Sequence, residues 1–184
     1  MRKGLGLLFA ISLCLPIAVL TAGSAGAANT VLPKCKSLSG TQTYKPGLPP
    51  TSSSAKVKPT TTTVANITGC TGGGIKSGRS SGSLKAKTAT NCQMLFANAG
   101  KPAPATPATI KWSNGQTTTT SNVLTVIGAT PQGDLKAKLV SKYTAGLGKG
   151  HTSTVQIVAH PNSGWCKTAP LSKVTFHSTS ITTK

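Results

Sequence analysis

Acidic side chains are almost absent from this 184-residue sequence, which sets 20 lysines and arginines against a single acid, Asp134. Glycosidases of the usual kind need two carboxyl groups, and calcium sites need several carboxylate oxygens, so both classes are excluded. Salt bridges within the chain are nearly impossible, and its positive charges repel one another.

Arginine and aromatic residues are also scarce, which argues against sequence-specific recognition of nucleic acid. Beyond Arg2 the only arginine is Arg79, and arginine is the side chain that most often reads guanine edges and phosphate groups. Aromatic residues make up 4% of the chain and are dispersed, so they form no evident stacking platform for bases.

Helical periodicity and motifs for catalysis or metal binding are missing as well. The best helical candidate, residues 92–97, is too short to distinguish a helix from a buried strand. No two cysteines have the short spacing of a zinc site. Residues 78–82 match the G-x-S-x-G string of serine hydrolases, but without the strand-turn-helix context that this motif requires, so we attribute the match to chance. We expect no enzyme activity, catalytic residue, cofactor or metal.

The N-terminal segment has the features of a secretory signal peptide. Arg2 and Lys3 precede an apolar stretch, and Ala25 and Ala27 are the small residues that signal peptidase requires. We predict a signal peptide over residues 1–27 with cleavage after Ala27, and therefore a secreted or envelope-associated protein with no membrane span after cleavage. An uncleaved membrane anchor is the alternative, because the apolar stretch is nearly long enough to span a bilayer.

Four cysteines remain after cleavage, and an even number in an exported chain indicates two disulfides. Three pairings are possible. We favour Cys35–Cys70, which would hold an N-terminal segment rich in Pro and Ser, together with Cys92–Cys166. The second bridge would close a long loop, which the chain-entropy treatment values at about 4 kcal/mol.

Short strands dominate the rest of the sequence. Residues 28–55 are rich in Pro, Ser and Thr and predict an extended lead-in with room for one short strand near Cys35, whereas residues 56–184 form the domain. Alternation of apolar and polar residues indicates half-buried strands, and Asn114-Gly115 predicts a hairpin turn. About seven or eight strands predict an immunoglobulin-like antiparallel two-sheet sandwich. The predicted core residues are Trp112, Leu95, Phe96, Ile127, Leu139, Val158, Val174 and Phe176.

Lysine is the most unusual component, because without Arg2 and Lys3 the chain keeps 18 basic residues against Asp134. The candidate contacts for polyanions are Lys-x-Lys pairs, whose side chains point the same way on a strand: Lys56 and Lys58, Lys85 and Lys87, and Lys136 and Lys138. The expected partners are anionic envelope polymers or lipid head groups. The alternative is a lysine surface that only keeps a Ser/Thr-rich domain in solution.

Two further functions remain open at this stage. A carbohydrate-binding domain would use Trp165 and Tyr143 as exposed stacking platforms. A hydrolase would need Asp134, a histidine and a serine to converge in one pocket.

The sequence resembles small secreted actinobacterial β-sandwich proteins of unassigned function. The residues that carry this resemblance are Cys35, the Gly69-Cys70-Thr71-Gly72 stretch, residues 110–115 followed by a Thr/Ser run, and Cys166. The resemblance implies a sandwich fold and an extracellular location, and it assigns no catalytic residues.

Overall fold

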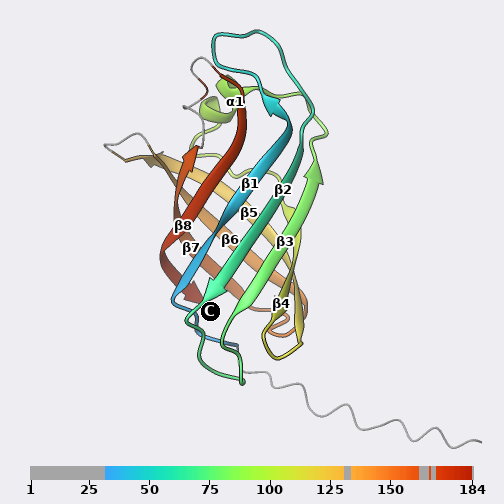
Figure 1. Ribbon diagram of the computed structural model, residues 1–184, viewed down its shortest axis with the longest axis vertical. Coiled ribbons are helices and arrows are strands. Elements are labelled where there is room, and N and C mark those ends of the chain that lie inside the picture. The colour runs from blue at the N-terminus through green and yellow to red at the C-terminus, as the bar shows by residue number, and fades with distance from the viewer. Residues whose placement is uncertain (1–31, 131–133, 162–165, 167–168, 184) are drawn as a thin grey trace, which may run out of the picture.

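The computed structural model describes residues 32–130, 134–161, 166 and 169–183, apart from the side chain of Phe96. The predicted signal peptide and its cleavage site after Ala27 lie outside the described residues. The elements in Figure 1 are, in chain order, β1 (Ser37–Leu48), β2 (Thr60–Thr68), β3 (Gly78–Lys85), α1 (Cys92–Ala97), β4 (Thr106–Trp112), β5 (Thr117–Ala129), β6 (Leu135–Gly146), β7 (Thr152–Pro161) and β8 (Leu171–Thr183).

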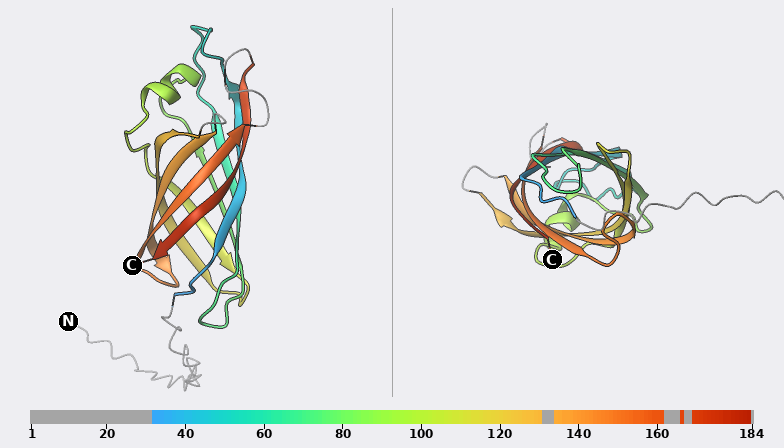
Figure 2. Two further views of the ribbon diagram at one scale, coloured as in Figure 1. Left: turned by 90° about the vertical axis from the view of Figure 1, so that its left-hand side faces the viewer. Right: turned by 90° about the horizontal axis from the view of Figure 1, so that it is seen from below.

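The eight strands form one closed antiparallel barrel, in which each strand pairs with its neighbours in sequence and β8 pairs with β1. Figure 2 shows the ring of strands in the view along the long axis. The prediction of an immunoglobulin-like two-sheet sandwich is therefore wrong, whereas the all-β class is confirmed. Alternation along a strand indicates which residues face a core, and a sandwich and a barrel impose the same alternation.

Closure of the barrel depends on β1, which lies within the segment predicted to be an extended lead-in. Residues 37–45 of β1 pair with β2, and residues 39–43 together with Leu48 pair with β8. The barrel therefore begins well before residue 56, the predicted start of the domain. The sequence did not predict this strand in full, because the segment is rich in Pro and Ser and lacks a clear alternation of apolar and polar residues.

Local signals in the later strands agree with the structure. Asn114 and Gly115 form the turn between β4 and β5, where Gly115 has a φ of 83° and donates its N–H to Trp112 O. In β6, Ala137 is buried while Lys136 and Lys138 are exposed, as the alternation predicts.

Trp112 is buried and is the last residue of β4, a strand that ends at the lower end of the barrel in Figure 1, opposite the end that carries α1. Its indole Nε1–H donates to Thr118 Oγ1 at 2.8 Å, and the Thr118 hydroxyl donates to Leu147 O at 2.8 Å. An ideal Cβ on Gly78 would lie 2.6 Å from the indole ring, so glycine is required for β3 to pass beside it. A hydrogen-bonded buried layer therefore closes this end.

A second cluster closes part of the upper end, beside α1. Leu48 and Leu171 are buried together with the Cys92–Cys166 disulfide. Cys92 is the first residue of α1, and its N–H donates to Pro49 O at 3.0 Å. Both predicted disulfides are confirmed, since Cys35 and Cys70 are also bonded, at the lower end. Tyr44 packs against the upper cluster, and burial raises its pKa to about 12.

The predicted core is only partly confirmed. Trp112 and Val174 are buried, but Ile127 is 51% exposed near the end of β5. Four other predicted core residues are only partly buried: Leu95, Leu139, Val158 and Phe176. The side chain of Phe96 lies outside the described part of the chain.

Candidate functional site

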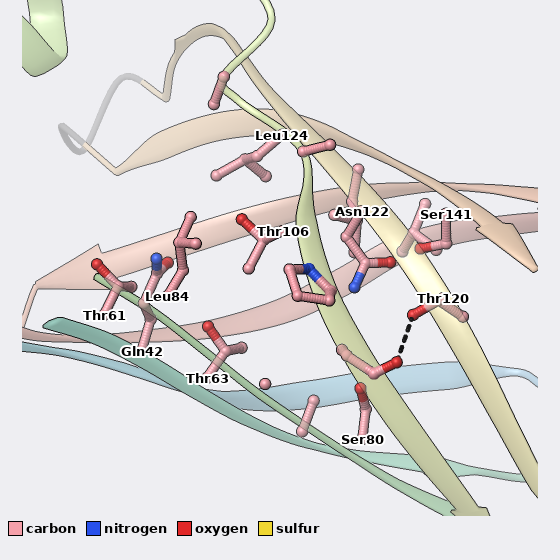
Figure 3. Close-up of a pocket in the computed structure, with 18 of the residues that line it drawn as sticks. Gln42, Thr61, Thr63, Ser80, Leu84, Thr106, Thr120, Asn122, Leu124 and Ser141 are labelled. Atoms are coloured by element: carbon pink, nitrogen blue, oxygen red, sulfur yellow. Dashed lines mark hydrogen bonds between the residues drawn. The ribbon is translucent and has the colours of Figure 1, made fainter. Parts of the chain in front are cut away.

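A cavity of about 770 Å³ occupies the interior of the barrel between the two end clusters. Its lining is mostly apolar carbon. Figure 3 shows side chains from several strands pointing into this space, among them Thr63 of β2, Thr120 and Asn122 of β5 and Ser141 of β6. Every strand contributes inward-facing residues, because alternate side chains of a strand face the same side.

Small polar side chains line one part of the wall. Thr61, Thr63, Ser80 and Thr106 reach the cavity from β2, β3 and β4. The Thr120 hydroxyl donates to Ala108 O at 3.3 Å, so part of this polarity is satisfied within the wall itself. Short side chains at these positions leave the interior open, whereas large apolar ones would have filled a barrel of eight strands.

Apolar side chains line the other part of the wall and the floor. Leu139, Val155 and Phe176 reach the cavity from β6, β7 and β8. Trp112 and Tyr143 border its lower end, where both are buried. A molecule inside the cavity would therefore contact carbon on one side and uncharged hydroxyl and amide groups on the other.

The wall of the barrel is incomplete at the upper part of the β3–β4 boundary. The ladder between these strands runs only from Gly78↔Trp112 to Ser81↔Thr109, although all of β3 pairs with β2. In the continued register Ser83 would face Pro107, which has no N–H to donate. Along a strand the N–H groups of alternate residues point to the same side. Ser113 donates its N–H to Ser77 O, on the β3 side, so the nitrogen of Pro107 also points toward β3.

Beyond that point the two strands continue with different partners. Residue Ala86 donates its N–H to Pro59 O at 2.9 Å, on the β2 side, while Ala103 donates to Leu124 O at 2.8 Å, on the β5 side. Residues 85–90 and 103–107 both line the cavity, together with Met94 of α1. We call this opening, bordered by residues 85–90, residues 103–107 and α1, the seam.

The structure places the six candidate polyanion contacts on two opposite walls. Lys85 is the last residue of β3, and Lys87 follows shortly after it. The segment that contains Lys56 and Lys58 lies alongside, since Ala86 N–H donates to Pro59 O and Val57 forms a β-bridge with Thr90. Lys136 and Lys138 lie on the outer face of β6, three strands away from β3 around the barrel. Four of the six therefore gather beside the seam, and all six side chains are exposed.

The geometry does not assemble the hydrolase that the sequence left open. His160 Nδ1 lies 2.6 Å from Asp134 Oδ1, but His160 is 67% exposed and neither residue lines the cavity. Among the described residues, no group of three or more His, Cys, Asp or Glu side chains is arranged to hold a metal ion.

The carbohydrate platform is not formed as predicted either. Tyr143 is only 8% exposed and faces the cavity floor, so it offers no ring to an external sugar. The other predicted platform residue, Trp165, lies outside the described part of the chain.

Sequence reasoning named Trp112, Leu139 and Phe176 as core residues, but it missed the polar residues that line the cavity. These polar residues belong to strands rich in threonine and serine, in which the inward-facing and the exposed side chains are of the same types. The sequence pattern therefore looks alike on both faces of the strand.

No helix within the described residues is long and apolar enough to cross a membrane. No family model matches the sequence, and neither a curated protein nor a solved structure is similar enough to match it. The resemblance to secreted actinobacterial proteins therefore stays a prediction.

Proposed function

We propose that this protein binds an apolar small molecule inside the barrel and catalyses no reaction on it. The observation that carries the proposal is the cavity of about 770 Å³, which the protein's own side chains leave unfilled. Protein interiors are close-packed and rarely hold voids larger than a water molecule. Ligand pockets, in contrast, measure about 300–1,000 Å³ and are lined mainly by apolar groups.

The compartment that we propose for this activity is extracellular. Two disulfides, Cys35–Cys70 and Cys92–Cys166, are consistent with an extracellular protein, because such bonds persist in oxidising surroundings. A protein of this kind would carry a poorly soluble compound outside the cytoplasm or hold it at the envelope.

Filling the cavity tests this proposal. Thr63 lines the cavity, whereas Thr62 beside it is exposed on the outer face of β2. We expect Thr63→Trp to weaken binding of the uncharged dye N-phenylnaphthylamine by about tenfold or more, because the indole occupies the ligand's space. Thr62→Trp adds the same side chain outside the barrel and should leave the affinity unchanged. Dye fluorescence measures both.

Two results would contradict the proposal. One is the absence of saturable dye binding by the parent protein, and the other is equal weakening of binding by Thr63→Trp and Thr62→Trp. Circular dichroism spectra that match the parent's would show that both variants retain the fold.

A second proposed activity is contact with anionic envelope polymers or lipid head groups. The observation that favours it is the gathering of Lys56, Lys58, Lys85 and Lys87 beside the seam. Replacing these four lysines with glutamine should reduce retention on anionic liposomes at low salt, and added salt should abolish retention of the parent. Retention that does not depend on salt would exclude this mode of contact.

A further inference from the structure

The charges along the cavity are distributed unevenly. Within the described residues, Lys85 and Lys87 are the only cavity-lining residues that carry a charge at neutral pH. Both border the seam, and their exposure keeps the ammonium groups in water. The interior below them offers only hydroxyl, amide and apolar groups, and the floor is formed by Trp112 and other apolar residues.

We infer that the ligand is a long-chain amphiphile with an anionic head group, which lies at Lys85 and Lys87 while its apolar chain extends down the barrel to Trp112. This inference rests on the proposed function, and it specifies the class of ligand.

The interior supports this orientation because it has no partner for a charge. Transfer of an ionised carboxylate from water into an uncharged interior is strongly unfavourable unless a cation pairs with it. The head group therefore stays at the seam, where the lysines and water both reach it. The reverse orientation would place the anion beside Trp112 and Tyr143, among buried side chains.

Among the described residues, no acidic side chain is available to pair with the lysines at the seam. The only acidic residue, Asp134, is paired with His160. An anion supplied by a ligand would therefore not have to displace an ion pair with an acidic side chain.

The dimensions also suit a long chain. Gly78 pairs with Trp112 at the lower end of β3, and Lys85 ends the strand. The seven residue steps between them span about 23 Å at a rise of about 3.3 Å per residue. The cavity lining extends over this whole distance, from Trp112 to Lys87.

Hexadecanoic acid and hexadecanol provide the test, because they share a chain and differ in head-group charge. We expect the parent protein to bind the acid about tenfold more tightly than the alcohol, as measured by displacement of the uncharged dye. In Lys85→Gln/Lys87→Gln this preference should fall to about twofold or less, with affinity for the alcohol unchanged. The matched control, Lys136→Gln/Lys138→Gln, removes the same charge from the opposite wall and should keep the preference.

The outcomes separate this inference from the proposed function. If the parent binds acid and alcohol equally, or if Lys85→Gln/Lys87→Gln keeps the preference, the inference is wrong while the binding function stands. If both lysine variants lose the preference alike, net charge rather than the seam determines it, and the inference is again wrong. If neither compound displaces a dye that binds saturably, the inference is wrong while the binding function stands, whereas absence of saturable dye binding would end the proposed function as well.

Discussion

Removing the Cys92–Cys166 disulfide is expected to lower the free energy of unfolding by about 4 kcal/mol. The bond joins residues 74 apart in sequence and links the start of α1 to the segment between β7 and β8. Without it the unfolded chain gains conformational freedom, which favours unfolding. Urea unfolding of Cys92→Ala/Cys166→Ala, followed by circular dichroism, measures the effect.

The other disulfide is the comparison. Cys35 and Cys70 are 35 residues apart, so loop entropy alone makes their bond less stabilising by under about 1 kcal/mol. Both Cys92 and Cys166 are fully buried, however, and Thr51 N–H donates to Cys166 O at 2.7 Å. We therefore expect Cys92→Ala/Cys166→Ala to be more destabilising than Cys35→Ala/Cys70→Ala. A loss below about 1 kcal/mol in the former would contradict the view that this bond secures the upper end.

Replacing Thr118 with valine is expected to lower the free energy of unfolding by about 2–4 kcal/mol. Valine keeps the shape of threonine but removes the hydroxyl that links Trp112 Nε1 to Leu147 O. Thr118 is 0% exposed, so water cannot replace the lost partner, and a buried donor and a buried acceptor are left unpaired. Urea unfolding followed by tryptophan emission, in a Trp165→Phe background that leaves Trp112 alone, reports the change.

Thr119 provides the matched control. It follows Thr118 directly in β5, but its side chain is exposed on the outside of the barrel. Thr119→Val should change stability by less than about 0.5 kcal/mol. Equal effects of the two substitutions would show that the buried hydrogen bonds at the lower end do not contribute as described.

The threonine runs explain why the candidate site could not be predicted from the sequence. Residues 117–120 are four threonines, of which Thr118 and Thr120 are buried and the other two exposed. The pattern of residue types carries no information about which face is inside, because identical side chains stand on both. Where apolar residues alternate with lysine, as around Ala137, the inward face was predicted correctly.

Closure of the barrel was beyond sequence reasoning for a different reason. It depends on pairing between β1 and β8, at opposite ends of the described chain, and no local pattern reports such a contact. The seam had a local signal, since Pro102, Pro104 and Pro107 lie close together and proline interrupts strand pairing. The prolines predict a gap in strand pairing, but only the structure shows that β3 is the strand on the other side of the gap.

The G-x-S-x-G match has a structural explanation instead of a catalytic one. Residues 78–82 lie within β3, without the turn into a helix that a nucleophile would need. Gly78 accommodates Trp112, and an ideal Cβ on Gly82 would lie 2.6 Å from Pro107 O. The two glycines therefore allow close approach of neighbouring groups, and Ser80 between them lines the cavity.

Quenching of Trp112 by a brominated ligand tests most directly whether an apolar chain enters the barrel. The chain has two tryptophans, so Trp165→Phe leaves Trp112 as the only one. Bromine quenches indole fluorescence on contact, and Trp112 borders the cavity floor. We predict saturable quenching by hexadecanoic acid brominated at its terminal carbon, and much weaker quenching when bromine is next to the carboxylate. Absence of saturable quenching by both acids would contradict an accessible binding cavity.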